Sequence, residues 1–125
     1  MLTGKRVLIF DDDPDLLIIF RFLFEDHGWE VHTFETCDEV VEQAHKFSPH
    51  LILMDNWIPN IGGVEATRRL KREPVVQEIP VIYISANSNV KELSAEAGAD
   101  AFMAKPFDFD QLHHLAESLT AEINF

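Results

Sequence analysis

The feature that most constrains the fold of this chain is a fivefold alternation of short apolar runs with longer amphipathic stretches. The apolar runs are RVLIF at 6–10, WEVHTF at 29–34, HLILM at 50–54, PVIYIS at 80–85 and DAFMA at 100–104. Most are too short for helices and rich in β-branched or aromatic residues, which favours strands. Strict alternation of strand and helix predicts a parallel sheet with helices on both faces. We therefore expect an α/β fold, a doubly wound five-stranded parallel sheet with five helices, in a single domain over residues 1–125.

Helix boundaries between the apolar runs are marked by capping residues. Asp13 followed by Pro14 is typical of a helix start, and Gly28 follows the expected end of that helix. Thr36 and Glu39 match the T-x-x-E capping box, which predicts that a second helix begins there. The remaining helices are predicted at about 63–72, at about 89–97 and from 108 onward.

Composition limits the location and the partners of the chain. Its 125 residues are enough for one domain with a hydrophobic core, and no apolar stretch approaches the ~18 residues of a membrane span. The single cysteine, Cys37, cannot form an internal disulfide, and the first residues lack a signal-peptide pattern, so we expect a cytoplasmic protein without membrane contact. The net charge of −12 would repel a phosphate backbone, so we expect no direct nucleic-acid binding.

Polar side chains gather where the predicted strands end. Asp11 and Asp12 follow the first strand, Asp55 follows the apolar run of the third, Ser85 ends the fourth and Lys105 follows the fifth. In open parallel sheets, ligands bind beyond the carboxyl ends of the strands. These side chains are therefore expected to form one site.

The residue types in this set suit phosphoryl transfer. Crowded carboxylates repel each other, which raises a pKa or recruits a cation, and Mg²⁺ prefers oxygen ligands such as Asp11, Asp12 and Asp55. A lysine can hold a phosphoryl oxygen and a hydroxyl can donate to it, so positioning and charge neutralisation would carry the catalysis. Asp55 is predicted to be the nucleophile that becomes an aspartyl phosphate. The simpler alternative is a solvated helix start, which is our interpretation of Asp13 alone.

Four segments together resemble the response regulator receiver domain of two-component signalling, over essentially the whole chain. They are VLIFDDDPD, LILMDNWIPNIGG, PVIYISA and GADAFMAKPF, and their order and spacing make the resemblance specific. The resemblance implies a flavodoxin-like strand order of 2-1-3-4-5. It also implies a phosphorylation switch that accepts its phosphoryl group from a sensor histidine kinase or a histidine phosphotransfer protein. Such a domain catalyses only its own phosphorylation and dephosphorylation, with Mg²⁺ or Mn²⁺ as cofactor.

The resemblance assigns the metal-binding and phosphate-accepting roles residue by residue. Asp11 and Asp12 match the acidic pair that holds the metal, and Asp55 matches the phosphate acceptor and a further metal ligand. The backbone carbonyl of Trp57 is expected to complete the protein ligands. Lys105 matches the lysine of the family, and its bond to Pro106 is expected to be cis.

Two further positions match the switch of the family. Ser85 corresponds to the hydroxyl that moves to the phosphoryl group, and Phe102 to the aromatic residue that turns inward with it. This movement is expected to shift the fourth helix, the fifth strand and the fifth helix, which form the output face. Trp57 is unusually large for its position, and we hypothesise that it shields Asp55 from water and slows the loss of phosphate.

The first helix is more apolar than its position requires. Its sequence is DLLIIFRFLF, and the stripe predicted to pack on the sheet is Leu16, Ile19, Phe20, Leu23 and Phe24. This assignment leaves Leu17, Ile18 and Phe22 on other faces. We predict that Ile18 and Phe22 form a partner surface for the histidine-bearing helices of a kinase or phosphotransfer protein. The alternatives are a homodimer contact and simple cover by a neighbouring helix.

Two other classes of function fit the sequence less well than a receiver domain does. A phosphohydrolase would use an Asp-x-Asp pair, which Asp11 and Asp13 match in spacing, but the following Pro14–Asp15 fits that class poorly. A pure interaction module would not need the complete set of catalytic groups. The six histidines show no metal-ligand spacing. We expect the chain to be either a stand-alone receiver protein or a piece of a larger regulator or hybrid kinase.

Overall fold

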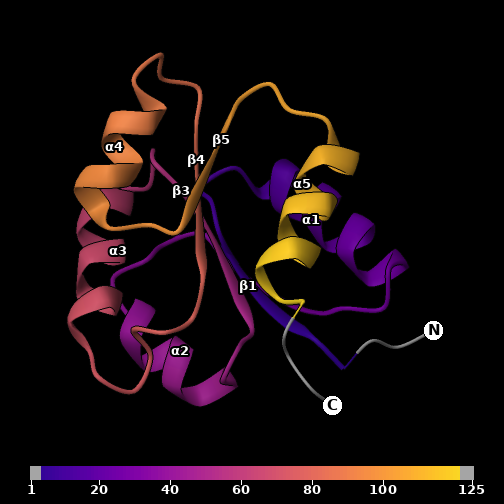
Figure 1. Cartoon of the computed structure of the whole chain (residues 1–125), viewed down its shortest axis with the longest axis horizontal. Helices are drawn as coiled ribbons and strands as arrows, with labels where there is room; N and C mark the ends of the chain where they lie inside the picture. Colours follow the sequence, from indigo (N-terminus) through magenta and orange to yellow (C-terminus); the bar gives the residue numbers. More distant parts are fainter. Residues whose placement is uncertain (1–3, 122–125) are drawn as a thin grey trace.

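A five-stranded sheet lies between two layers of helices in the computed structural model, which describes residues 4–121 (Figure 1). The strands are β1 (Arg6–Phe10), β2 (Glu30–Phe34), β3 (Leu51–Asp55), β4 (Val81–Ser85) and β5 (Ala101–Ala104). The helices are α1 (Pro14–Asp26), α2 (Val40–Phe47), α3 (Gly62–Arg72), α4 (Val90–Ala97) and α5 (Phe109–Leu119). All neighbouring strands are parallel, in the order β2-β1-β3-β4-β5. The predicted fold class and strand order are confirmed.

The two faces of the sheet carry separate apolar clusters, because side chains alternate along each strand. On β1, Leu8 and Phe10 belong to the cluster on the side of α2, α3 and α4, whereas Val7 and Ile9 face α1 and α5. Figure 1 shows these two helical layers on opposite sides of the sheet. The strands β3 and β4 are buried along their whole length, which explains their continuous apolar sequence.

The orientation of α1 differs from the predicted one. Its buried residues are Leu17, Phe20 and Phe24, while Ile19 is 53% exposed, so the prediction was wrong for Leu17 and Ile19. The aromatic rings set this rotation. Phe20 stacks on Phe107, and Phe24 makes edge contacts with two further rings. The largest side chains therefore take the deepest positions, and Leu17 lies on their side of the helix.

The predicted capping box at the start of α2 is wrong. The helix begins at Val40, after Thr36 and Glu39, and the side chain of the N-cap residue Glu39 makes no capping hydrogen bond. The reason lies in Cys37, which is fully buried and whose thiol donates to the carbonyl of Gly62. This anchor fixes a turn, closed by the N–H of Val40 on the carbonyl of Cys37, before the helix can start.

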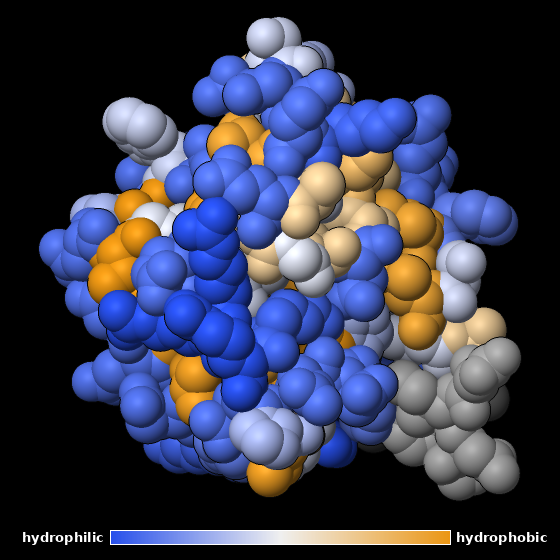
Figure 2. Space-filling view, turned by 60° about the vertical axis from the view of Figure 1, so that its left-hand side comes forward, coloured by the Kyte–Doolittle hydropathy of each residue, from blue (hydrophilic) through white to orange (hydrophobic). Residues whose placement is uncertain are grey.

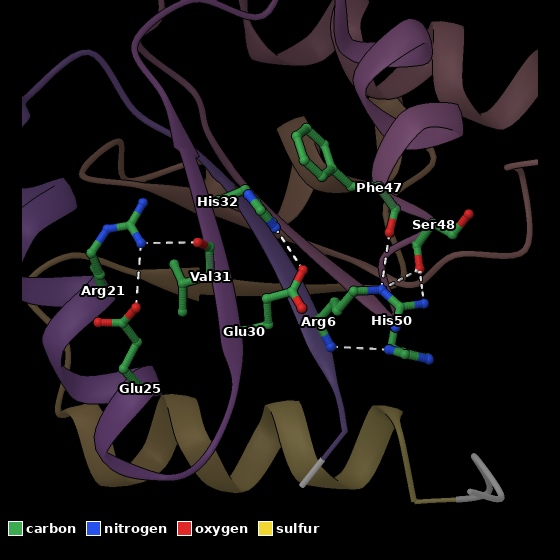
Figure 3. A network of polar contacts seen from close by, with 9 residues as sticks. All are labelled: Arg6, Arg21, Glu25, Glu30, Val31, His32, Phe47, Ser48 and His50. Carbon is green, nitrogen blue, oxygen red and sulfur yellow. Dashed lines mark hydrogen bonds and ion pairs between the residues drawn. The ribbon is translucent and has the colours of Figure 1, made fainter. Parts of the chain in front are cut away.

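Arg6 ties the end of α2 to the beginning of β1 (Figure 3). Its Nε donates to the carbonyl of Phe47 at 3.0 Å, and its Nη2 donates to the carbonyl of Ser48 at 2.7 Å. These carbonyls end the helix, so a cation is stabilising there. The backbone N–H of Arg6 donates to Nδ1 of His50 at 3.0 Å. This network lies at the amino-terminal ends of β1 and β3, whereas the predicted polar site lies at the carboxyl ends of the strands.

The surface is mainly hydrophilic, with apolar groups scattered over it in the view of Figure 2. This agrees with the net charge of −12. Among the helices of residues 4–121, none has both the length and the apolar character needed to cross a bilayer.

Candidate functional site

The carboxyl ends of the strands bring the predicted polar residues to one edge of the sheet. Asp11 follows β1, Asp55 ends β3, Ser85 ends β4 and Lys105 follows β5. Their side chains are not merely solvated ends, because Asp11 and Asp55 are only 2% and 4% exposed. Asp12 is exposed beside them. Buried carboxylates are costly unless they are paired or bind a cation.

Three carboxylates converge at this edge. One oxygen from each of Asp11, Asp12 and Asp55 lies within 4.8 Å of the other two. Within residues 4–121, no other group of three or more His, Cys, Asp or Glu side chains meets this criterion. Mg²⁺ prefers carboxylate oxygens as ligands and retains several of its water molecules. The exposed carboxylate, Asp12, leaves the site open to that water. The residues present therefore fit a magnesium ion.

Lys105 places a positive charge on the same carboxylates. Its Nζ lies 2.6 Å from Asp55 Oδ1 and 3.5 Å from Asp11 Oδ2. Burial alone would lower the pKa of Lys105, but the hydrogen bond and charge of Asp55, helped by Asp11, raise it. The amine therefore stays charged and can hold an oxygen of a group bound to Asp55.

The ionised form of Asp11 is disfavoured at this edge of the sheet. Burial raises the pKa of Asp11 to about 6, and the charge of Asp55 adds to this effect. The backbone N–H of Asp13, which donates to Asp11 Oδ1 at 2.9 Å, and the charge of Lys105 oppose it only in part. A divalent cation would remove this cost, because it favours the ionised form of every carboxylate around it.

The turn after β3 orients the Asp55 carboxylate. The backbone N–H of Trp57 donates to Asp55 Oδ2 at 2.9 Å. A Cβ atom on Gly63 would lie 2.3 Å from the carbonyl oxygen of Asp55, so only glycine allows α3 to approach this closely. Sequence reasoning missed the role of Gly63. The sequence did contain a signal, the Gly62–Gly63 pair that follows the segment after Asp55.

The switch residues lie at the predicted places, but their roles stay predictions. The hydroxyl of Ser85 is buried and accepts a hydrogen bond from the N–H of Asn87 at 3.0 Å. The ring of Phe102 is 41% exposed, so it lies outside the core. The Lys105–Pro106 bond is cis, as expected.

Asp13 has a structural role. Its carboxylate accepts hydrogen bonds from the N–H groups of Asp15 at 3.0 Å and Leu16 at 3.4 Å, and it thereby caps α1. This confirms the interpretation of Asp13 as a cap. It also weakens the phosphohydrolase alternative, because the second acid of that pair is engaged at the helix start.

The predicted partner surface on α1 is exposed. Ile18 is 66% exposed and Phe22 is 68% exposed. Other residues of α1 line an apolar groove of about 460 Å³ between this helix and the segment that follows β5. Ile19 and Lys105 both line this groove, so it links α1 to the residue that contacts Asp55.

A comparison with protein families decides what kind of domain this is. The model of the response regulator receiver domain matches residues 7–117. The chain belongs to this family. Its cluster of Asp11, Asp12 and Asp55 fits the magnesium-dependent phosphorylation of a two-component receiver domain.

Curated relatives of this receiver domain include longer transcription regulators. The chain is 30% identical over 111 residues to the phosphate regulon transcriptional regulatory protein PhoB of Escherichia coli (strain K12). That alignment covers 87% of this chain and 48% of the relative. The chain therefore spans about half the length of the curated relatives that it matches.

Solved structures of other receiver proteins share the fold. The response regulator TrrA from Thermotoga maritima, in complex with Mg²⁺-BeF, is 25% identical with a TM-score of 0.81, covering 92% of this chain and 98% of that one. The receiver domain of a sensor histidine kinase from Pseudomonas aeruginosa PAO1, with a magnesium ion coordinated in its active site cleft, is 24% identical. Its TM-score is 0.88, covering 96% of this chain and 100% of that one.

Proposed function

We propose that this receiver domain accepts a phosphoryl group from a phosphohistidine of a sensor histidine kinase or histidine phosphotransfer protein onto Asp55. The observation that carries the proposal is the contact of Lys105 Nζ with Asp55 Oδ1 at 2.6 Å, inside a cluster of three carboxylates. In the reaction, a carboxylate oxygen of Asp55 forms a bond to phosphorus and the bond from phosphorus to the imidazole nitrogen breaks. The imidazole leaves as a neutral group after it takes up a proton.

The metal is proposed to be Mg²⁺, with Mn²⁺ as an alternative ion that has the same ligand preference. Asp11, Asp12, Asp55 and the backbone carbonyl of Trp57 would hold it. A bound divalent ion supplies positive charge for the oxygens of the transferred group. The magnesium described in the Pseudomonas aeruginosa and Thermotoga maritima structures supports this choice.

The residues of the chain position the acceptor and respond to its new charge. Lys105 and the N–H of Trp57 orient the two oxygens of Asp55 before transfer, which avoids reorganisation during the reaction. An aspartyl phosphate brings a charge near −2, which attracts Lys105 and the hydroxyl of Ser85. Their movement, with Phe102 turning inward, is proposed to shift α4, β5 and α5. The domain catalyses only its own phosphorylation and dephosphorylation.

Mass spectrometry after treatment with acetyl phosphate and Mg²⁺ tests this function. Wild-type protein is expected to gain one phosphoryl group, whereas Asp55→Asn gains none. A label at another residue, or an equal label on the Asp55→Asn variant, would overturn the assignment of Asp55. Incubation with a generic phosphomonoester provides the comparison with a phosphohydrolase, for which many turnovers per protein would be observed.

The donor is proposed to dock on α1. Ile18 and Phe22 are exposed on this helix, and Ile19 of the same helix lines a groove that Lys105 also lines. The double variant Ile18→Glu with Phe22→Glu is expected to slow transfer from a phosphohistidine protein at least about tenfold, since burying a charge in an apolar contact is costly. Labelling by acetyl phosphate should not change. Equal loss with both donors would indicate damaged folding instead.

A second copy of the chain is the alternative occupant of the α1 surface. Sedimentation of the wild type and of the same double variant separates the two, because a homodimer would dissociate in the variant. This proposal also includes a single receiver domain over residues 1–125, no direct nucleic-acid binding and a cytoplasmic location. Cell fractionation checks the location.

The shielding hypothesis for Trp57 stays a prediction. Its side chain is 79% exposed and, with Asp12, lines a hollow of about 350 Å³. The hypothesis expects the Trp57→Ala variant to lose phosphate faster than the wild type after the phosphodonor is removed. An unchanged or slower loss would contradict it.

A further inference from the structure

One polar side chain in the core is not explained by the roles assigned so far. Tyr83 lies in the middle of β4, with 0% exposure, in the cluster on the side of α2, α3 and α4. Its hydroxyl donates a hydrogen bond to the side-chain oxygen of Asn56. Asn56 directly follows Asp55 in the chain. A buried hydroxyl therefore contacts the residue next to the phosphate acceptor.

Asn56 is the first residue of the turn between β3 and α3, and several hydrogen bonds meet at it. Its backbone N–H donates to the carbonyl of Ile84 at 2.8 Å. Its own carbonyl accepts from the N–H of Ile58 at 3.2 Å and from that of Gly63 at 3.4 Å. The Tyr83 hydroxyl adds a bond to the side chain. The strand β4 thus holds Asn56 at two points, the carbonyl of Ile84 and the hydroxyl of Tyr83.

The turn that Asn56 anchors carries groups of the site itself. The N–H of Trp57 donates to Asp55 Oδ2, and the carbonyl of Trp57 is a proposed metal ligand. Gly63 packs against the Asp55 carbonyl, where a Cβ atom would meet it at 2.3 Å. Because this packing leaves no free space, a shift of Asn56 would move the groups on both sides of it.

We propose that Tyr83 is a positioning residue of the phosphorylation site: its hydroxyl fixes Asn56 and, through it, the turn that orients the Asp55 carboxylate and the Trp57 carbonyl. This inference rests on the proposed function. Tyr83 contacts no reacting atom. Its ring fills the core as phenylalanine would, so the hydroxyl is the part that the site requires.

The hydroxyl is suited to this task. Burial, followed by the nearby charge of Asp55, raises the pKa of Tyr83 above its ordinary value, so it stays a protonated donor. Removing it leaves the partly buried side-chain oxygen of Asn56 without its tyrosine partner, and such a group seeks another one. The turn would then populate other conformations, and the acceptor would lose its orientation.

The variant Tyr83→Phe tests the proposal with acetyl phosphate and Mg²⁺ as probes. We expect the rate of Asp55 phosphorylation to fall about tenfold, since small misplacements of reacting groups have effects of this order or larger. Mg²⁺ affinity should weaken as well, because the Trp57 carbonyl is displaced. Circular dichroism should show a retained fold.

The matched control is Ile82→Val on the same strand, because the side chain of Ile82 faces the other helical layer. It lowers stability but should leave the rate within about twofold, since it touches no group of the turn.

A double-mutant cycle makes the result decisive. Asn56→Ala should cause a similar fall in rate, and Tyr83→Phe combined with Asn56→Ala should cause no further fall, since both remove the same bond. A wild-type rate and Mg²⁺ affinity in Tyr83→Phe, or fully additive losses in the double variant, would overturn the positioning role. If the wild type itself took no phosphoryl group, the proposed function would fail, while the Mg²⁺ affinities would still decide the role of Tyr83.

Discussion

Lys105 is the residue at which the opposing demands of the site are clearest. Its one positive charge lies between two buried carboxylates, Asp55 at 2.6 Å and Asp11 at 3.5 Å. The same positive charge opposes the binding of a divalent cation and favours the arrival of a phosphoryl group. Loss of the Lys105 charge should therefore slow the phosphorylation of Asp55 and strengthen the binding of Mg²⁺.

The variant Lys105→Met tests this pair of effects. We expect phosphorylation by acetyl phosphate to slow by about a hundredfold, because a preorganised charge on the transferred group is lost. We expect Mg²⁺ to bind more tightly, because the carboxylates lose their internal counter-charge. Lys105→Arg serves as the control that keeps the charge. Weaker Mg²⁺ binding in Lys105→Met would contradict this account of the site.

Gly63 has a role that depends on space alone. Gly63→Ala would place a methyl group 2.3 Å from the Asp55 carbonyl oxygen, so the turn or α3 must shift. We expect a loss of about 1–3 kcal/mol in the free energy of unfolding, together with slower phosphorylation. The control is Gly62→Ala, where no atom lies within 4 Å but the backbone has φ +79°. It should lower stability by about 1 kcal/mol through backbone strain while leaving the acceptor in place.

At the scale of elements, the end of α1 contacts α5 through a pair of histidines. The rings of His27 and His113 lie 4.0 Å apart, and His113 Nε2 lies 3.2 Å from Glu117 Oε1. Glu117 in turn pairs with Lys5 at 2.9 Å. Burial, followed by the charge of His27, holds the pKa of His113 below 6.5, although Glu117 opposes this effect.

This pair predicts a contribution to the pH dependence of stability. Since the pKa of His113 is lower in the folded state, the unfolded state binds more protons in this range. The contribution is therefore complete above pH 6.5 and is lost as the pH falls from that value through the lower pKa of the folded state. Urea unfolding of His113→Phe should show a smaller fall in midpoint between pH 7.5 and 5.5 than the wild type does. The exposed neighbour His114 provides the control, His114→Phe, which should follow the wild type. An identical pH dependence in wild type and His113→Phe would refute the assignment.

The elements differ in how far the sequence predicts them. The strands lie within one residue of their expected starts and ends, because continuous apolar runs such as LILM are buried on both faces. The carboxyl-edge residues could be predicted because parallel strands all end at the same edge. The capping box at Thr36 failed because a tertiary contact, the burial of Cys37, outweighs local capping. The rotation of α1 was missed because ring packing of Phe20 and Phe24 decides it.

Sequence reasoning could not predict contacts between residues that lie far apart in the chain. Tyr83 meets Asn56 across 27 positions of the chain, and His27 meets His113 from a different helix. No periodicity or spacing encodes such partners, since they depend on strand register and helix orientation. The only trace of the first was the tyrosine hydroxyl in the middle of the apolar strand VIYIS.

At the scale of the whole molecule, the fold gathers negative charge at one edge of an acidic domain. The net charge of −12 and the three converging carboxylates favour cations, and Lys105 alone would not neutralise that cluster. The α/β architecture makes this arrangement stable, because two apolar layers on the sheet offset the cost of buried carboxylates at its edge. The chemistry of the domain therefore depends on where four separate strands, β1, β3, β4 and β5, end.

A crystal structure with Mg²⁺ and beryllofluoride, a stable mimic of a phosphoryl group, tests the central claim most directly. The account predicts beryllium bonded to a carboxylate oxygen of Asp55, a fluoride within hydrogen-bond distance of Lys105 Nζ, and a cation on Asp11 and Asp12. A beryllofluoride group on another residue, or an ammonium of Lys105 turned away from Asp55, would contradict it.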